Sequence, residues 1–222
     1  FPAAGIKFWD CAHECNAGMS ADGYTRATGK MSMAIAQNGP GITNFVTPIM
    51  TAYWNHSPLL LVTPQAANKT IEQGGFQEVK QMAAFENMVC YQEEVREPSR
   101  IAEVLNRVIE KAHRESAPAQ INVPRDHWTH VIDIELPQII RMERSPGGEN
   151  AIAEAAKLLS DAEFPVILNG AGVVLSGAIE SSRVLAEKLD APVCCNYQHN
   201  DSFYGSHPLF AGPLGYNGSK AA

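Results

Sequence analysis

Short apolar runs alternate with helix-like patterns along the chain, and this alternation limits the possible folds more than any other feature of the sequence. One apolar run ends at Ala36, and others lie within residues 59–63, 165–169 and 191–195, while residues 120–123, Gln-Ile-Asn-Val, give another expected strand that ends at Pro124. Runs of this length that are bounded by Gly, Pro or polar residues are typical of buried strands. Strands that are separated by helices pair in parallel, because each connection crosses back to the same end of the sheet. The sequence therefore predicts an α/β fold built on parallel sheets.

Helices are expected between these strands, beginning with residues 15–28 and 43–54. Gly29 follows the first helix and suits the left-handed conformation in which many helices end. Another helix follows Ser99, which is the expected N-cap. Its apolar positions recur at the spacing of an amphipathic helix: Ile101, Val104, Leu105, Val108 and Ile109.

The segment 141–150 has the Ser, Pro and Gly content of a linker, and it separates two expected domains. Residues 1–140 form the first. Residues 151–222 repeat the strand-helix-strand order and predict part of a Rossmann-like central domain. The chain opens without Met, and residues 218–222 have the pattern of a helix start, so we expect both ends to be cut.

Composition excludes several classes of function. The 17 Lys and Arg residues and 24 Asp and Glu residues give a formal net charge of −7, which repels a phosphate backbone and argues against nucleic-acid binding. No apolar stretch reaches the roughly 18 residues of a membrane span, so a cytoplasmic location is expected. The five cysteines form no C-x-x-C pair, as expected of reduced thiols. Cys11, His13 and Cys15 leave a zinc site open, but no second cluster completes four ligands.

Two polar stretches carry the chemistry. Residues 13–30 place the carboxyl group of Glu14 at a helix start, and residues 37–44 contain a Gly-Pro-Gly bend that opens another helix. Gly39 and Gly41 lack Cβ, so the backbone can approach a ligand closely, and the amides at a helix start are free to bind it. Read alone, Glu14 is also an ordinary first-turn acid that the helix dipole favours, and the bend an ordinary loop.

Together these stretches resemble the pyrimidine-binding domain of thiamine-diphosphate-dependent enzymes of the acetolactate-synthase-like group. In that family His-Glu, a helix of small residues ending in Asp-Gly-Tyr-x-Arg-x-Thr-Gly-Lys, and Gly-Pro-Gly-x-x-Asn recur in this order. The resemblance continues through residues 52–62, 74–78 and 117–126, so it covers essentially the whole chain. It implies a parallel-sheet pyrimidine-binding domain followed by part of the central domain.

The resemblance implies that Glu14 hydrogen-bonds N1′ of the aminopyrimidine ring and promotes the tautomer that activates the thiazolium carbon. A carboxyl group in a dry pocket has a raised pKa and can share a proton near neutral pH. Asn44 either contributes to the cofactor site or only helps to begin a helix. The residues implied to line the cofactor are Glu14, Gly39, Pro40, Gly41, Asn44 and Phe76.

The resemblance also implies the cofactor thiamine diphosphate, whose diphosphate group is held, together with Mg²⁺, by a C-terminal domain that carries a Gly-Asp-Gly…Asn stretch. No such stretch occurs here, so no metal ligand is predicted, and the fragment by itself is not expected to catalyse. Because the cofactor normally spans two chains in this family, the working unit is expected to be a homodimer or homotetramer.

Strings of rare residues resemble one branch of the family, whose members convert sulfoacetaldehyde and phosphate to acetyl phosphate and sulfite. These strings are residues 8–14, 36–38, 52–56, 63–70, 88–94 and 197–201. Residues 15–17, Cys-Asn-Ala, depart from the usual small-residue run and leave the fine substrate preference open. Two alternatives remain: acetolactate synthase or another 2-oxo-acid carboligase or decarboxylase on the same scaffold, and a non-catalytic α/β ligand-binding or regulatory module.

Other candidates each have a plainer reading. Gln77 matches a family segment that lines the reaction centre, where it could donate to an oxyanion, but the segment is also a packed loop. His13 either positions substrate or caps the strand. Lys69 either binds a sulfonate or phosphate group or is only exposed to solvent. His199 follows a strand in the second domain, where α/β folds bind ligands. Residues 170–172, Gly-Ala-Gly, lack a third glycine, so neither a dinucleotide nor a flavin is predicted.

Overall fold

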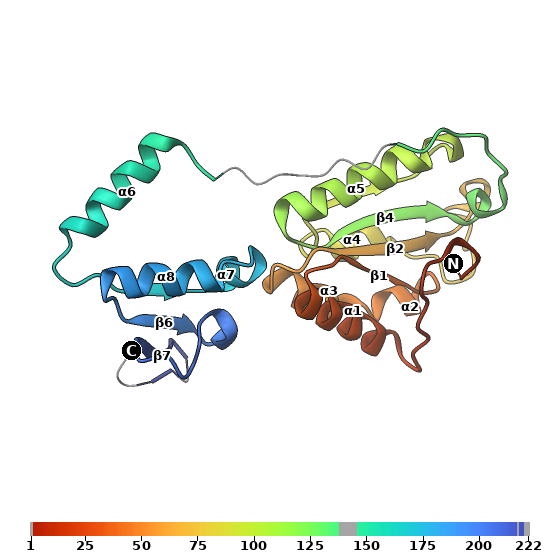
Figure 1. Cartoon of the computed structure of the whole chain (residues 1–222). Helices are drawn as coiled ribbons and strands as arrows, with labels where there is room; N and C mark the ends of the chain where they lie inside the picture. Colours follow the sequence, from red (N-terminus) through yellow and green to blue (C-terminus); the bar gives the residue numbers. More distant parts are fainter. Residues whose placement is uncertain (1, 138–145, 217, 220–222) are drawn as a thin grey trace. The chain divides into compact units, whose positions relative to one another are not determined.

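The computed structural model describes residues 2–137, 146–216 and 218–219, and it divides into two compact units, Phe1–Met142 and Glu143–Ala222 (Figure 1). Residues 141–145 of the expected linker lie outside the described residues, and helix α6 already begins at Glu149. Residues 220–222 of the expected C-terminal helix start also lie outside them.

The first unit contains a four-stranded parallel sheet in the order β1-β2-β4-β3. Its strands are β1 (Ser32–Ile35), β2 (Leu59–Gln65), β3 (Tyr91–Glu94) and β4 (Ala119–Pro124). The two central strands, β2 and β4, are almost completely buried, and β4 buries the polar side chains of Gln120 and Asn122 along with its apolar ones. The predicted parallel α/β fold is therefore confirmed. Strand β1 was expected to be buried, but it lies at the sheet edge, and only Ala34 is buried there.

Helix α1 (Glu14–Thr28) covers one face of this sheet and packs on α3 (Val46–Trp54). The predicted end of α1 is confirmed: Gly29 has φ 68°, and its amide donates to the Thr25 carbonyl at 2.8 Å. The contact between the two helices is close at Gly18, where a Cβ would come within 2.5 Å of Pro48 Cγ. The absence of a side chain at Gly18 therefore sets how near α1 lies to α3.

The helix predicted over residues 43–54 is confirmed as α3, but α3 begins only at Val46, after a separate short helix α2 (Pro40–Thr43). Asn44 ends α2 and does not begin a helix. Pro48 explains the break. It has no amide hydrogen, so a continuous helix would leave the Asn44 carbonyl without its partner four residues later. Because of the break, Asn44 lies between α2 and α3, next to the Gly-Pro-Gly bend.

Helix α5 (Ile101–Glu115) covers the other face and buries Val104, Val108 and Ala112. The prediction of Ser99 as its N-cap is wrong, because a 3-10 turn over Pro98–Arg100 precedes the helix and Arg100 occupies the cap position. The proline fixes the tight turn, and the Ser99 hydroxyl instead lies 3.5 Å from the Glu97 carboxylate.

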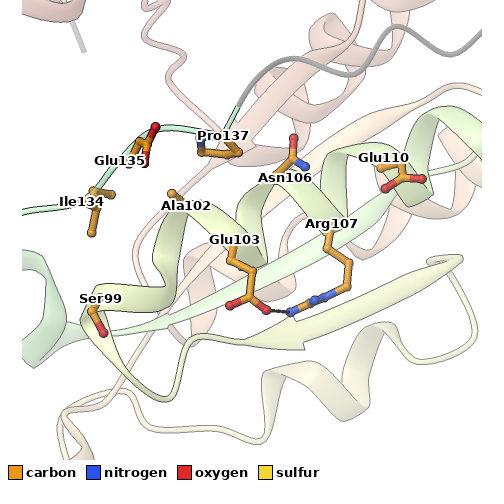
Figure 2. A pocket seen from close by; sticks show the side chains of 9 residues that line it. All are labelled: Ser99, Ala102, Glu103, Asn106, Arg107, Glu110, Ile134, Glu135 and Pro137. Atoms are coloured by element: carbon orange, nitrogen blue, oxygen red, sulfur yellow. Dashed lines mark hydrogen bonds and ion pairs between the residues drawn. The ribbon is translucent and has the colours of Figure 1, made fainter.

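A pocket lies between the outer face of α5 and the segment 134–137 (Figure 2). Arg107 lines it and pairs with Glu103 at 3.1 Å and, in a two-point contact, with Glu93 at 2.8 and 2.9 Å. Hydrogen bonds from Arg100 and Arg107 lower the pKa of Glu103 to about 2. Arg107 and Glu103 of this pocket are thus held in ion pairs, and none of the predicted site residues lines it.

The second unit has a three-stranded parallel sheet in the order β5-β6-β7, formed by Ile167–Asn169, Val193–Asn196 and Phe210–Leu214. Helices α7 (Ala171–Leu175) and α8 (Ile179–Leu189) connect β5 to β6, and α6 (Glu149–Asp161) precedes them. The predicted strand-helix-strand unit is therefore confirmed. Its buried core is Ala186, Val193, Cys195 and Phe203.

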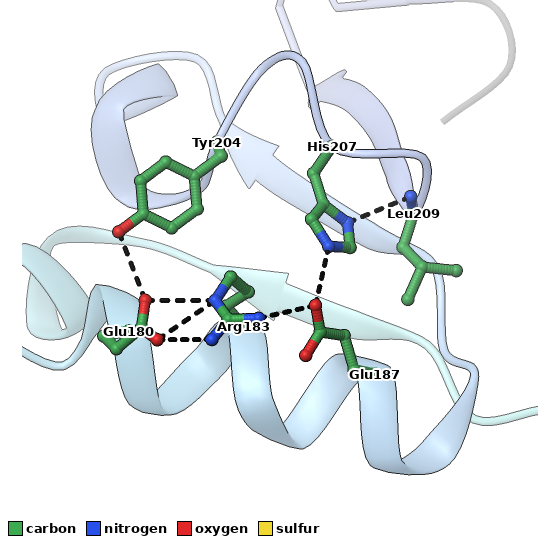
Figure 3. Close-up of polar contacts among 6 residues, drawn as sticks. All are labelled: Glu180, Arg183, Glu187, Tyr204, His207 and Leu209. Atoms are coloured by element: carbon green, nitrogen blue, oxygen red, sulfur yellow. Dashed lines mark hydrogen bonds and ion pairs between the residues drawn. The ribbon is translucent and has the colours of Figure 1, made fainter.

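Helix α8 is tied to the turn before β7 (Figure 3). Arg183 bridges Glu180 and Glu187 along the helix, and Glu187 reaches His207 Nε2 at 3.2 Å. The Leu209 amide donates to His207 Nδ1 at 3.2 Å, so the neutral ring carries its hydrogen on Nε2, facing Glu187. These contacts fix the position of the turn that leads into β7.

Within the described residues, no helix is long and apolar enough to cross a membrane.

Candidate functional site

The carboxylate of Glu14 lies beside the Gly-Pro-Gly bend. Asn44 Nδ2 donates to Glu14 Oε2 at 2.9 Å, and a Cβ added to Gly41 would lie 3.3 Å from Glu14 Oε1. His13 is the N-cap of α1, and its Nδ1 accepts from the Cys15 amide at 3.1 Å. The fold thus brings together residues of the two predicted stretches. His13 caps helix α1 and not the strand, which was one of its two readings, and its role in positioning substrate stays a prediction.

The bend has a backbone conformation that requires glycine. Gly39 has φ 75° and ψ −120°, and a Cβ there would meet the Gln77 carbonyl oxygen at 2.5 Å. Asn38 Nδ2 donates to the carbonyl oxygens of Phe76 and Gln77, at 3.2 and 3.0 Å. Pro40 is the middle residue of the bend and the first residue of α2, a position where the missing amide hydrogen of proline costs nothing. Residues 76–77 therefore lie against the bend, as the resemblance implied.

Phe76 and Gln77 have unusual environments. The Phe76 side chain is 75% exposed although it is a large apolar group. Gln77 has φ 57°, a left-handed conformation that costs about 1 kcal/mol or more outside glycine. Gln77 Oε1 is buried and has no hydrogen-bond partner within the described part of the chain. An exposed aromatic ring and an unsatisfied buried amide side by side are features of a site that a ligand completes.

The expected raised pKa of Glu14 is wrong for this chain on its own. The hydrogen bond from Asn44 lowers the pKa of Glu14, and a backbone hydrogen bond of Glu14 lowers it further. Burial, which would raise the pKa, is outweighed because the side chain is only half-buried. The ionised form of Glu14 is therefore stabilised by these neighbours. A dry environment, which would raise the pKa of Glu14, requires further groups that cover the carboxylate.

We expect Asn44→Ala to raise the pKa of Glu14 toward its ordinary value of about 4.3. The amide donates to the ionised carboxylate, so its removal stabilises the protonated form. Carboxyl-labelled NMR titration of the protein without cofactor measures this shift. Because the folded-state pKa is depressed, the stability from this contact is present above the unfolded pKa and is lost as the pH falls through the folded pKa.

The stability lost in Asn44→Ala is therefore expected to be larger at pH 7 than at pH 3. Asn16→Ala is the matched control, because Asn16 is exposed on α1, two residues after Glu14. An unchanged Glu14 titration midpoint in Asn44→Ala would show that the hydrogen bond does not govern this carboxylate.

Lys69 and His199 are not brought to this cluster by any contact within the described residues. Lys69 is exposed in a 3-10 turn, Asn68–Thr70, which the Asp126 carboxylate holds by accepting from the Asn68 amide at 3.2 Å. His199 belongs to the second unit, is 8% exposed, and lies 3.6 Å from the Asp201 carboxylate. The substrate roles of both residues stay predictions.

Sequence reasoning missed two residues beside the bend. Asn38 fastens residues 76–77 to it. Gln81 is fully buried at the start of α4 (Gln81–Phe85), and its Oε1 lies 3.5 Å from the Gly39 amide. Asn38 lies within the Gln-Asn-Gly-Pro-Gly string that marked the bend, but nothing in the pattern around Gln81 separates it from a surface glutamine.

In residues 2–137, 146–216 and 218–219, no three His, Cys, Asp or Glu side chains lie close enough to hold a metal ion. Cys11 and Cys15 are free and half-buried.

Two family descriptions match the chain. Residues 1–84 match the N-terminal TPP binding domain of thiamine pyrophosphate enzymes, and residues 152–222 match the central domain of the same enzymes. The first match contains Glu14, the Gly-Pro-Gly bend and Gln77.

Curated relatives match over the whole chain. A probable sulfoacetaldehyde acetyltransferase of Rhizobium meliloti (strain 1021) is 76% identical over 222 residues, which are 100% of this chain and 38% of that protein. The sulfoacetaldehyde acetyltransferase of Roseovarius nubinhibens is 77% identical over 221 residues, 100% of this chain and 37% of the relative. A probable acetolactate synthase large subunit of Methanocaldococcus jannaschii is 36% identical, over 95% of this chain and 37% of the relative. The chain thus spans well under half the length of the relatives it matches.

Solved structures share the fold. A thiamine diphosphate-dependent 4-hydroxybenzoylformate decarboxylase of Rhodococcus jostii RHA1 aligns with a TM-score of 0.75 and 24% identity, covering 87% of this chain and 39% of that one. A putative thiamin diphosphate-dependent enzyme of Mycobacterium smegmatis aligns with a TM-score of 0.76 and 24% identity, covering 92% of this chain and 40% of that one.

Proposed function

The chain belongs to the thiamine pyrophosphate enzymes, and from this premise we propose that the full-length protein is an acetyltransferase that converts sulfoacetaldehyde and phosphate to acetyl phosphate and sulfite. The relatives named as sulfoacetaldehyde acetyltransferases, at 76 and 77% identity, support this substrate over the acetolactate synthase relative at 36%.

The observation that carries the proposal is the position of the Glu14 carboxylate beside Gly41. Because a Cβ at Gly41 would lie 3.3 Å from Glu14 Oε1, glycine keeps the space next to this oxygen clear. A carboxylate oxygen that is held in this way can share a proton with a basic ring nitrogen that approaches it. These residues therefore fit the aminopyrimidine ring of thiamine diphosphate, which when bound supplies a thiazolium carbon that becomes nucleophilic on losing its proton.

Each residue at the bend has a distinct proposed role. Glu14 holds the proton that it shares with N1′ of the ring, and Asn44 fixes the other carboxylate oxygen. Gly39, Pro40 and Gly41 form the backbone wall beside the ring. A bound ring and substrate would cover the exposed Phe76 side chain, and the Gln77 amide would donate to the substrate oxygen. Removal of water from this site is what would raise the pKa of Glu14 during turnover.

The proposal extends to groups outside the described residues. Diphosphate and Mg²⁺ would be held by the remainder of the full-length protein, and the working unit would be a homodimer or homotetramer in the cytoplasm. A sulfonate or phosphate would be attracted by the ammonium group of Lys69. His199 would act from the central domain.

The full-length protein should release sulfite from sulfoacetaldehyde when thiamine diphosphate, Mg²⁺ and phosphate are supplied. Acetyl phosphate should form in equal amount, and pyruvate should give little acetolactate. Acetolactate as the main product would favour the carboligase alternative. Neither product, together with no thermal protection by thiamine diphosphate, would favour a non-catalytic module.

A further inference from the structure

Gln81 is a buried glutamine with three polar contacts. Its side chain is 0% exposed at the first position of α4. The Oε1 atom faces the Gly39 amide at 3.5 Å, and Nε2 donates to Asn122 Oδ1 at 2.9 Å and to the Pro64 carbonyl oxygen. Both amide hydrogens and the amide oxygen therefore have partners. Because a buried amide is costly unless its groups are paired, this arrangement is specific to glutamine.

The contacts of Gln81 connect the bend to the carboxyl ends of the central strands. Pro64 belongs to β2 and Asn122 to β4, and both strands are buried. Asn122 also accepts from the Thr63 hydroxyl at 2.7 Å and donates to the Glu94 carboxylate at 2.7 Å. The network therefore spans β2, β4 and β3, and Gln81 is the member that contacts Gly39.

We propose that Gln81 is a positioning residue for the cofactor site, an inference that rests on the proposed function. Gln81 holds the amide of Gly39, and the position of Gly39 sets that of Gly41 and Asn44, whose atoms surround the Glu14 carboxylate. Loss of the Gln81 amide leaves the Gly39 amide and the Pro64 carbonyl without these partners. The bend then relaxes, and Glu14 no longer meets the ring nitrogen at the correct distance and angle.

Gln120 provides a matched control in the same network. It is also a glutamine with 0% exposure, and its Nε2 donates to the Thr63 hydroxyl at 3.0 Å. It lies two residues before Asn122 on β4 and has no described contact with Gly39. Substitution of either glutamine by Met removes an amide from the network, but only Gln81→Met acts directly on the bend.

The test uses the full-length enzyme with Mg²⁺. Thiamine diphosphate affinity is measured by fluorescence titration, and hydrogen-deuterium exchange at C2 of the bound cofactor is measured by NMR at saturation. We expect Gln81→Met to weaken cofactor binding about tenfold and to slow C2 exchange by a similar factor. Gln120→Met should stay within about twofold of wild type in both measurements, even if its melting temperature falls as much as that of Gln81→Met.

Equal effects of Gln81→Met and Gln120→Met on binding and exchange would overturn the positioning role. If Gln81→Met does not fold, Gln81→Asn replaces it, because the shorter amide cannot reach all three partners and should produce the same difference from Gln120→Met. The Glu14→Gln variant separates the two proposals. Wild-type exchange in Glu14→Gln refutes the proposed function, whereas lost exchange in Glu14→Gln with normal exchange in Gln81→Met refutes only the positioning role.

Discussion

Glu14→Gln in the full-length enzyme is expected to reduce sulfite release from sulfoacetaldehyde by about a hundredfold or more. Glutamine retains the size of the side chain and can still accept a hydrogen bond, but it has no carboxylate with which to share a proton. Exchange of the proton at C2 of bound thiamine diphosphate should fall together with turnover, because both require the activated ring. The paired measurement separates a chemical defect from weak substrate binding.

Glu86→Gln is the control for this experiment. Glu86 is an exposed glutamate that ends α4 in the same unit, so the substitution makes the same change of charge away from the bend. We expect near wild-type turnover from it. C2 exchange in Glu14→Gln at the rate of Glu86→Gln would remove Glu14 from the reaction.

Gly39→Ala is expected to have the second largest effect. The new Cβ would lie 2.5 Å from the Gln77 carbonyl oxygen and 2.8 Å from Gln77 Cβ, at a backbone φ of 75°. The backbone strain alone costs about 1–2 kcal/mol, and the clash forces residues 76–77 away from the bend. Denaturant unfolding should show the loss of stability, and cofactor titration should show binding weakened at least about tenfold.

Two other glycines separate strain from clash. Gly74 also has a positive φ, of 73°, but a Cβ there has nothing within 4 Å, so Gly74→Ala introduces strain without the clash. Gly23 lies within α1 with open space at its Cβ, and Gly23→Ala should be neutral or slightly stabilising. Equal cofactor affinity in Gly39→Ala and Gly74→Ala would show that the contact with Gln77 is unimportant.

Much of the site could be predicted from the order of its motifs. The string around Glu14, the Gly-Pro-Gly bend and the Phe76-Gln77 loop are local sequence features, and the fold brings them together through α1, α2 and the loop before α4. The parallel sheet followed from the buried runs that became β2 and β4. Local pattern succeeds for β2 because burial on both faces leaves an apolar run at residues 59–62, and β4 alternates apolar residues with the buried Gln120 and Asn122.

The errors came from contacts between distant residues and from one proline within a helical pattern. The pKa of Glu14 depends on Asn44, thirty residues later, and on how much of the carboxylate is covered. The break before α3 depends on Pro48, which lies within an otherwise helical pattern. Strand β3, Tyr-Gln-Glu-Glu, has no apolar run that would mark it as a strand. It lies at the sheet edge, and its Glu93 pairs with Arg107 of α5.

Gln81 shows the same limit in the core. A glutamine at a helix start is usually exposed, and only the meeting of α4 with β2 and β4 makes it a buried partner of the bend. Its role arises from three contacts with residues that are 17, 41 and 42 positions away in sequence. No periodicity or motif encodes such a set.

The most direct test is a structure of the full-length protein with thiamine diphosphate bound. The account predicts one oxygen of the Glu14 carboxylate about 3 Å from N1′ of the aminopyrimidine, in the space beside Gly41, with the other oxygen on Asn44. A bound ring whose N1′ contacts another group, with the Glu14 side chain turned to solvent, would contradict it.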